Sequence, residues 1–362
     1  MPRILPAFRH ASLSVLLTMI LMVTVTFVAL VAALGEARAA ERTIVIVAQN
    51  GGTEVTDFLV PYGVLSRAGV GDVRAVSTEA GSVFLWPGLT VEVDETLDQF
   101  DSRLPQGADL VIIPAVLDYD DEALISWLKQ QADKGAMLVS ICDGALILAR
   151  TGVLDGHNAT GHWYTEGIRQ DHFPEVTWQT NVRYVHDGMV ATSAGVSASL
   201  PISLYLVEQL AGKERAEALA RELGVQGYGA AHNSDVFDIG AGEVWVAARN
   251  FTFGWPRDVY ALTLSDGMDE IALAFAVDMF SRTYRSEIVA VGTARAKTLG
   301  GLLVVPNQLA LDASAAVVSF DGSGDLTPRP GASAPNDILS FLADRYGRDS
   351  ADFVALQLEY PH

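Results

Sequence analysis

Residues 137–149 read Met137-Leu-Val-Ser-Ile-Cys-Asp-Gly-Ala-Leu-Ile-Leu-Ala149, an apolar strand that runs into a helix with the chain's only cysteine, Cys142, at the junction. A strand-turn-helix corner of this kind, a nucleophile elbow, lifts one side chain clear of the sheet. The N–H groups at the start of the helix face that side chain and lower the pKa of a thiol. We therefore expect Cys142 to be a reactive thiolate. The alternative is a small buried hydrophobic residue, a common role for a free cysteine.

Strands and helices alternate on either side of this corner. The pattern predicts apolar strands at 44–47, 73–77, 110–114 and 137–141, with helices at 56–68 and 120–134. Such alternation is typical of the α/β class, in which helices cover both faces of a parallel sheet. Functional sites in these sheets lie at the carboxyl ends of the strands. Cys142 and the turn at 49–53 are therefore expected at one edge of the sheet.

The second half of the chain repeats part of the first. A shift of 215 positions aligns 63–67 with 278–282 and 73–78 with 288–293, and a slightly smaller shift aligns the strand before Cys142 with 353–357. Ala272 then stands where the first copy has Asp57, and the second copy has no cysteine. Two ungapped blocks in one register favour a degenerate duplicate over chance similarity.

This repeat divides the chain. We predict a first domain over 43–212, a connecting segment over 213–256 and a degenerate half-repeat over 257–362, which contains no elbow. The connecting segment is too apolar for a free linker, because it contains several aromatic side chains: Trp245, Phe251, Phe253 and Trp255. It is expected to pack as a strand or clasp on one of the two domains.

Charge and the N-terminus limit the partners and the location. The formal net charge of −20 argues against nucleic acid and anionic membrane surfaces as partners.

Arg3 and Arg9 precede an uncharged apolar run at 11–34, and Ala37-Arg38-Ala39 has the small residues of a signal-peptidase site. The run is also long enough for an uncleaved anchor. Residues 1–40 are thus predicted to be a signal peptide or N-terminal membrane anchor. The remainder then lies outside the cytoplasm, in the periplasm or at the extracytoplasmic face of the membrane.

Two further side chains are candidates to act with Cys142. Asp57 starts the helix after the first strand in an apolar segment, where burial would keep it protonated as a donor to the thiolate; its alternative role is an N-cap. His162 lies in a loop that can return to the same edge and act as a general acid or base; its alternative is a loop histidine with solvent partners. The spacing of His157 and His162 does not suit a metal, so we predict neither metal nor cofactor.

Four motifs give the first half a family resemblance, and they are Cys142–Ala149, Thr151–Gly156, Thr160–Trp163 and Thr192–Ala198. Together they resemble the ThiJ/PfpI family (class I glutamine amidotransferase-like). Within it they are most similar to isonitrile hydratases and to the amidotransferase-like domains of AraC-type regulators. The resemblance covers about 43–212 and implies a flavodoxin-like α/β sandwich, a three-layer fold that is usually dimeric, so a homodimer is an expected partner. It also implies Cys142 as nucleophile, Asp57 as its acid and His162 as the family's histidine.

Departures from the family pattern narrow the expected activity. Asp143 stands where protease-like members have histidine, so a protease is disfavoured, and its charge would raise the pKa of the thiol. Ala115 and Val116 replace a glycine turn that commonly binds an oxyanion, which leaves the backbone N–H groups of Ala115, Val116 and Asp143 as candidate donors. We predict an exported cysteine-dependent hydrolase or hydratase of a small molecule. The alternative is a non-catalytic ligand-binding or redox-sensing module, so the residues leave open whether the protein is an enzyme.

Overall fold

The computed structural model describes residues 17–25, 42–237, 240–310 and 315–361, and it has two compact parts, Met1–Arg42 and Thr43–His362. In the first part, residues 17–25 are helical. Most of the predicted signal peptide or anchor lies outside the described residues. Within the part of the chain that the structure describes, no helix combines the length and the hydropathy needed to cross a membrane.

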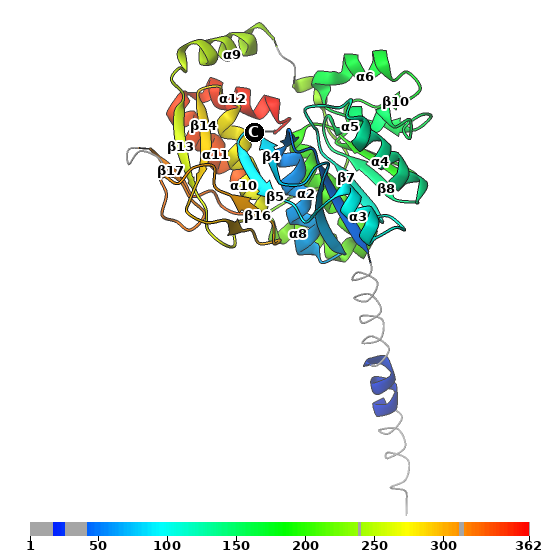
Figure 1. Ribbon diagram of the computed structural model, residues 1–362. Helices are drawn as coiled ribbons and strands as arrows, with labels where there is room; N and C mark the ends of the chain where they lie inside the picture. The colour runs from blue at the N-terminus through cyan, green and yellow to red at the C-terminus, as the bar shows by residue number, and fades with distance from the viewer. Residues whose placement is uncertain (1–16, 26–41, 238–239, 311–314, 362) are drawn as a thin grey trace, which may run out of the picture. The chain divides into compact units, whose positions relative to one another are not determined.

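A seven-stranded sheet forms the centre of the first half, in the order β11-β12-β8-β7-β1-β3-β6 (Figure 1). Neighbouring strands pair in parallel except β11 with β12. The predicted α/β class with a parallel sheet is confirmed. The strands are β1 (Thr43–Ala48), β3 (Asp72–Ser77), β6 (Glu95–Thr96), β7 (Leu110–Ile113), β8 (Met137–Ser140), β11 (Tyr184–Asp187) and β12 (Val190–Ser193).

Helices cover both faces of this sheet. Alternate residues of β1 face opposite sides, as a strand requires, so Ile44 and Ile46 enter one core and Val45 and Val47 the other. The first core lies under α2 (Val55–Ala68), α7 (Ser199–Ala211) and α8 (Lys213–Glu222); the second lies under α3 (Leu97–Arg103), α4 (Glu122–Asp133) and α5 (Gly144–Arg150). The result is the three-layer sandwich that the resemblance implied.

The second half contains a smaller version of the same arrangement. Its sheet β14-β13-β17 is parallel and corresponds to β3-β1-β7. Its elements are β13 (Asp258–Thr263), α10 (Glu270–Ser281), β14 (Ser286–Val291) and β17 (Val317–Val318). β13 and the start of α10 lie 215 positions after β1 and the start of α2, which is consistent with the predicted partial repeat.

Two details of the predicted alignment are wrong. Thr43 pairs with Asp72, whereas Asp258 pairs with Ser286, so the second copy is one residue shorter before its second strand. Residues 353–357 belong to helix α12 (Arg348–Gln357) and not to a strand. The buried apolar residues in and beside this segment recur with the spacing of a helix face rather than of a strand. They are Ala351, Val354, Ala355 and Leu358.

The correspondence between the two halves continues after a long segment that the second half lacks. Helix α11 (Ala334–Tyr346) meets α12 at Gly347, with a φ of 90°, just as α7 meets α8 at Gly212, with a φ of 86°. Both pairs have 13 and 10 residues. The second half therefore passes from β17 to the counterparts of α7 and α8, and it skips the segment that carries the elbow in the first half.

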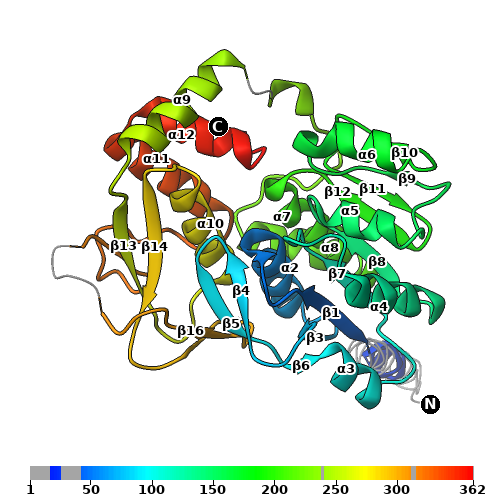
Figure 2. The ribbon, with the colours of Figure 1, turned by 45° about the horizontal axis from the view of Figure 1, so that its top comes forward.

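The two halves share one hydrophobic core, in which α2 packs against α10 (Figure 2). A mixed sheet, β15-β16-β5-β4-β2, also joins them, because β5 of the first half pairs with β16 of the second. These strands are β2 (Thr53–Glu54), β4 (Ser82–Trp86), β5 (Leu89–Glu92), β15 (Ala296–Lys297) and β16 (Leu303–Val305).

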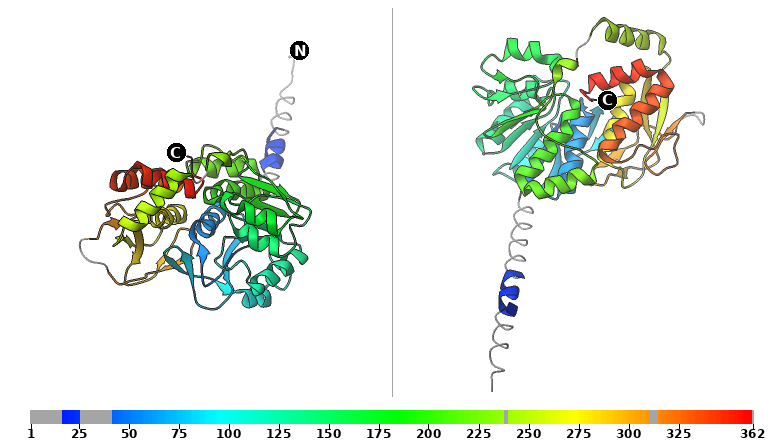
Figure 3. Two further views of the ribbon diagram at one scale, coloured as in Figure 1. Left: turned by 90° about the horizontal axis from the view of Figure 1, so that it is seen from above. Right: turned by 180° about the vertical axis from the view of Figure 1, so that it is seen from behind.

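Two helices lie in the connecting segment, and the residues between them that the structure describes form loops and one 3-10 turn. The helices are α8 and α9 (Ala241–Phe253), and α9 packs on α12 at the chain's C-terminal end (Figure 3). The expected strand or clasp is therefore a helix, and it packs on the second half. Residues 43–362 form one compact unit, and the division at 212 and 257 stays a prediction.

Candidate functional site

The elbow at Cys142 has a strained backbone. Cys142 follows β8 and has a φ of 56°, a left-handed conformation that costs an ordinary residue about 1–3 kcal/mol. Helix α5 begins two residues later at Gly144, where an added Cβ would lie 2.1 Å from the carbonyl oxygen of Ile113. Glycine is therefore required for α5 to start so close to β7. The corner presents the Cys142 side chain beyond the carboxyl end of the sheet.

A cavity of about 550 Å³ lies over this corner. Five of the predicted site residues line it: Cys142, His162, Ala115, Val116 and Asp143. Asp57 is fully buried and is not part of the lining. Aromatic rings form much of the wall, from Trp86, Trp163, Tyr164, Tyr284 and Phe353. The cavity therefore suits a small molecule with substantial apolar surface.

Asp57 is held by the backbone on one side only. It is not the N-cap of α2, because Glu54 has that position and accepts a hydrogen bond from the Asp57 N–H at 2.6 Å. Its Oδ2 accepts from the Ala115 N–H at 3.1 Å, and its Oδ1 has no hydrogen-bond partner among the described residues. Burial raises the pKa of this carboxyl to about 8. At neutral pH Asp57 therefore carries a proton, and its unpartnered Oδ1 can donate it.

The Cys142 thiol differs from the expected thiolate. Burial, followed by the charges of Asp57, Asp143 and Glu54, raises its pKa well above the usual value, and the Asp143 N–H opposes this only in part. Helix α5 has seven residues, so its dipole is weak beside these carboxylates. The Asp57 charge is absent below about pH 8, however, so its contribution is missing at neutral pH. The sequence signal for a lowered pKa was outweighed by burial.

His162 is buried, with 8% of its surface exposed, so the alternative of a solvated loop histidine is wrong. Its Nδ1 accepts from the Tyr164 N–H at 3.3 Å, and its Nε2 lies 3.3 Å from the carbonyl oxygen of Gln357. The loop is tied to the elbow by Thr165, whose hydroxyl donates to Asp143 at 2.5 Å. The two predicted partners of Cys142 therefore come to the same corner by different routes.

A metal site at this corner lacks a free imidazole nitrogen. Cys142, Asp143 and His162 each offer one ligand atom, and these atoms lie within 4.8 Å of one another. Both ring nitrogens of His162 already have partners, however. Zinc ligation needs an unprotonated ring nitrogen directed at the ion. We do not assign the group as a metal site, and the absence of a metal or cofactor stays a prediction.

Several functional side chains were missed by the sequence reasoning. Arg282, from the second half, lies 3.3 Å from Glu54 and 2.6 Å from Asp278, and it lines the cavity. Gln357 donates from its side chain to the Arg282 carbonyl at 3.0 Å, while its own carbonyl faces His162. Glu359 accepts from His232 at 3.0 Å. Only Arg282 had a signal, since the repeat aligns it with Arg67.

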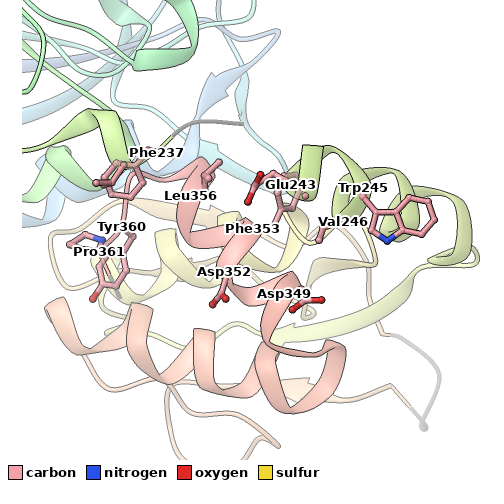
Figure 4. A pocket seen from close by; sticks show the side chains of 12 residues that line it. Phe237, Glu243, Trp245, Val246, Asp349, Asp352, Phe353, Leu356, Tyr360 and Pro361 are labelled. Carbon is pink, nitrogen blue, oxygen red and sulfur yellow. The ribbon is translucent and has the colours of Figure 1, made fainter. Parts of the chain in front are cut away.

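A second cavity of about 680 Å³ lies between α9 and α12 (Figure 4). Phe353 and Glu243 border both cavities. Its remaining polar lining is acidic, from Asp349 and Asp352. None of the predicted site residues lines it, so the chemistry is concentrated in the cavity at Cys142.

Known proteins resemble parts of the chain. The HTH-type transcriptional regulator CdhR of Pseudomonas aeruginosa is 30% identical over 151 residues, which are 41% of this chain and 44% of CdhR. Isonitrile hydratase of Pseudomonas putida is 30% identical over 105 residues, which are 29% of this chain and 44% of that enzyme. The chain thus spans less than half the length of either relative. The solved structure of oxidized Toxoplasma gondii DJ-1 has 24% identity and a TM-score of 0.45, covering 51% of this chain and 99% of that one.

The family match covers the half of the chain that carries the elbow. Residues 42–209 match the DJ-1/PfpI family, and this segment includes β1, α2, the elbow and all but the last two residues of α7. The same segment contains the four motifs on which the sequence resemblance rests. Residues 42–209 therefore form a domain of the DJ-1/PfpI family.

Proposed function

We propose that this protein is a cysteine-dependent hydrolase or hydratase of a small, mainly apolar molecule with an electrophilic carbon. The observation that carries the proposal is the Cys142 thiol, which lines the cavity and feels the charge of Asp57, a buried carboxyl whose pKa is raised to about 8 and whose Oδ1 has no hydrogen-bond partner among the described residues. A buried acid held protonated beside a nucleophile is an arrangement used for acid catalysis. The size and aromatic wall of the cavity favour a small substrate.

The first step is addition of the thiol to the electrophilic carbon of an isonitrile, an amide or an ester. In an isonitrile the S–C bond forms and the thiol proton passes to the carbon, which gives a thioimidate. In an amide or ester the S–C bond forms, the bond from the carbon to the amine or alcohol breaks, and the leaving group takes the thiol proton, which gives a thioester. Water then adds to the trigonal carbon of the thioimidate or thioester, the S–C bond breaks, and Asp57 donates its Oδ1 proton to the departing sulfur and recovers one from the water. The Val116 and Asp143 N–H groups are the backbone donors for developing negative charge. The Ala115 N–H is already held by Asp57.

His162 carries a proton in this scheme only after one of its ring nitrogens has lost its present hydrogen-bond partner. To carry a proton to or from substrate, its Nε2 must exchange the Gln357 carbonyl for the substrate or for water. A bound substrate that reaches the Trp163 side of the cavity would bring about that exchange. The relative that is an isonitrile hydratase supports a hydratase as the first activity to assay.

The test is turnover of a panel of isonitriles, small amides and activated esters by the purified chain. We expect product formation that is abolished by Cys142→Ser and reduced at least tenfold by Asp57→Ala, because removal of a general acid typically costs two or more orders of magnitude. Asp98→Ala, at an exposed site on α3, is the matched control and should leave the rate unchanged. Turnover that persists in Cys142→Ser would refute the assignment of the nucleophile.

A second candidate function is a ligand-binding or redox-sensing module. The raised thiol pKa of Cys142 favours it, because a protonated thiol is a weak nucleophile. A relative that is a transcriptional regulator also supports it. Saturable binding of a small molecule without turnover, unchanged in Cys142→Ser, would select a binding role. Loss of that binding after peroxide treatment in the wild type alone would select redox sensing.

We also propose that residues 1–40 direct the chain out of the cytoplasm, as a cleaved signal peptide or an N-terminal anchor. The charged start and the apolar run that follows support this. Expression of the full chain with fractionation of periplasm and membrane, followed by N-terminal sequencing, separates the two forms. Recovery of the intact chain in the cytoplasm would contradict both.

A further inference from the structure

Two ion pairs join the two halves, and the residues of one pair occupy the same positions in the repeat as the residues of the other. Arg67 of α2 lies 2.8 Å from Asp269, and Arg282 lies 3.3 Å from Glu54. Arg282 is 215 positions after Arg67, and Asp269 is 215 positions after Glu54. Each half thus gives its arginine to the equivalent acid of the other half. Exchange of this kind is the signature of an isologous interface with a two-fold axis.

Helices and strands show the same exchange. Helix α2 packs against α10, its own counterpart in the repeat. Strand β5 pairs antiparallel with β16, its counterpart, and the pairing is centred on Val91 opposite Val304, with Thr90 opposite Val305 and Glu92 opposite Leu303. Antiparallel pairing of equivalent strands also requires a local two-fold axis. Three separate contacts therefore agree on one symmetry.

We propose that the second half stands in for a second subunit, docked on the first half about this internal two-fold axis, and that it completes the Cys142 cavity with Arg282 as a positioning residue. The homodimer expected from the family resemblance is then replaced by a contact within one chain. The faces of α2 and β5 that would meet another copy are already covered by α10 and β16.

The two sides of the pseudo-symmetric contact differ in their chemistry. On the Arg282 side, the second half contributes Arg282, Tyr284, Phe353 and Gln357 to the wall of the cavity. On the Arg67 side, Ala272 replaces the counterpart of Asp57, and the elbow segment has been omitted. Arg67 and Arg282 are thus structural equivalents, of which Arg282 alone faces the nucleophile.

Arg282 influences Cys142 through its own charge and through the carboxylates with which it pairs, Glu54 and Asp278. The charged and titratable groups around the thiol are Glu54 and Asp57 at the start of α2, Asp143 at the elbow, His162 and Arg169 beyond it, and Arg282 from the second half. Burial raises the pKa values of Glu54 and Asp57, and the charge of Arg282 opposes this rise in part. Removing its charge would leave Glu54 and Asp278 uncompensated beside Asp57, and the thiol would become harder to ionise.

The experiment compares Arg282→Gln with its matched control Arg67→Gln in the full chain. Both variants remove one arginine from the same kind of ion pair, so both should lower the midpoint of thermal unfolding. Cys142 alkylation by iodoacetamide is then followed from pH 6 to 10 under native conditions. We expect Arg282→Gln to move the alkylation midpoint upward by about half a pH unit or more, equivalent to roughly threefold slower reaction below the midpoint. Arg67→Gln should leave it in place, and Arg282→Lys should restore most of the wild-type profile.

Equal shifts in Arg282→Gln and Arg67→Gln, or no shift in either, would overturn the role of Arg282. Sedimentation velocity tests the internal two-fold directly. We expect the wild type and both variants to sediment with the same mass. A wild-type species of two chains that falls to one chain in Arg67→Gln or Arg282→Gln would show that these arginines bind another copy, and it would refute the proposal. Neither measurement needs a substrate, so failure of the proposed enzyme activity does not affect the outcome.

Discussion

Replacing Asp57 with asparagine should make the stability of the protein less sensitive to pH. The asparagine side chain keeps a carbonyl oxygen for the Ala115 N–H, which now lies 3.1 Å from Oδ2 of Asp57, but it cannot ionise. In the folded wild type, burial raises the pKa of Asp57 from 3.8 to about 8. A shift of this size corresponds to roughly 6 kcal/mol of disfavoured ionisation, at about 1.4 kcal/mol for each pH unit.

The sign follows from proton binding. Between about pH 4 and pH 8 the folded protein holds the Asp57 proton and the unfolded chain does not, so the folded state binds more protons and loses stability as the pH rises. Stability is complete below the unfolded pKa and is lost as the pH approaches the folded value of about 8. The advantage of Asp57→Asn should therefore grow by up to about 1.4 kcal/mol for each unit from pH 5 to pH 8, then level off.

Urea unfolding followed by tryptophan fluorescence at pH 5, 6, 7, 8 and 9 measures this advantage. Asp98→Asn, on the exposed surface of α3, is the control and should differ from the wild type by a constant amount. A difference between Asp57→Asn and wild type that stays constant across this range would mean that Asp57 is ionised in the folded protein. Asp57 would then have no proton to donate to Cys142, and its assignment as the acid would be refuted.

Three further predictions concern the elbow and the end of the chain. Cys142→Ser should abolish alkylation and leave the midpoint of thermal unfolding within a few degrees of wild type; strong destabilisation would instead support a packing role for the thiol. Gly144→Ala should cost about 2–4 kcal/mol in urea unfolding, because its Cβ would meet the Ile113 carbonyl, and a neutral result would show that α5 moves away freely. Glu359→Gln should lower stability by about 1–2 kcal/mol at pH 7. Burial alone would raise the pKa of Glu359, but the hydrogen bond with His232 holds it below its usual value. This cost should therefore shrink as the pH falls to 4, and a cost independent of pH would contradict the pairing.

The fold was largely predictable because its signals are local. The alternation of apolar strands with amphipathic helices predicted the parallel sheet, and the Cys142-Asp-Gly144 corner predicted the elbow. The error at 353–357 has a physical origin. A short apolar run has the same composition in a buried strand and in a helix, so its periodicity is ambiguous. Residues 353–357 are helical because α12 packs against α11 in the shared core.

The site was predictable only in part, because several of the residues around it come from distant parts of the sequence. Cys142, Asp57 and His162 carry motifs, so the sequence could propose them together. The raised thiol pKa depends first on how deeply the thiol is buried and then on the three carboxylates near it, a property of packing that no motif encodes. Arg282 and Gln357 reach the cavity from the second half, and no spacing in the sequence predicts that contact. Arg282 could have been suspected only as the counterpart of Arg67.

The position of Glu359 has a practical consequence for work with this protein. Its side chain is almost fully buried, with 1% of its surface exposed, and lies against Gly195, while its carbonyl accepts from the Ser197 hydroxyl. Gln357 lies two residues before Glu359, and its carbonyl oxygen contacts Nε2 of His162. A substitution or insertion at Glu359 therefore also displaces the backbone that supports His162, and activity measurements should leave residues 357–361 unmodified.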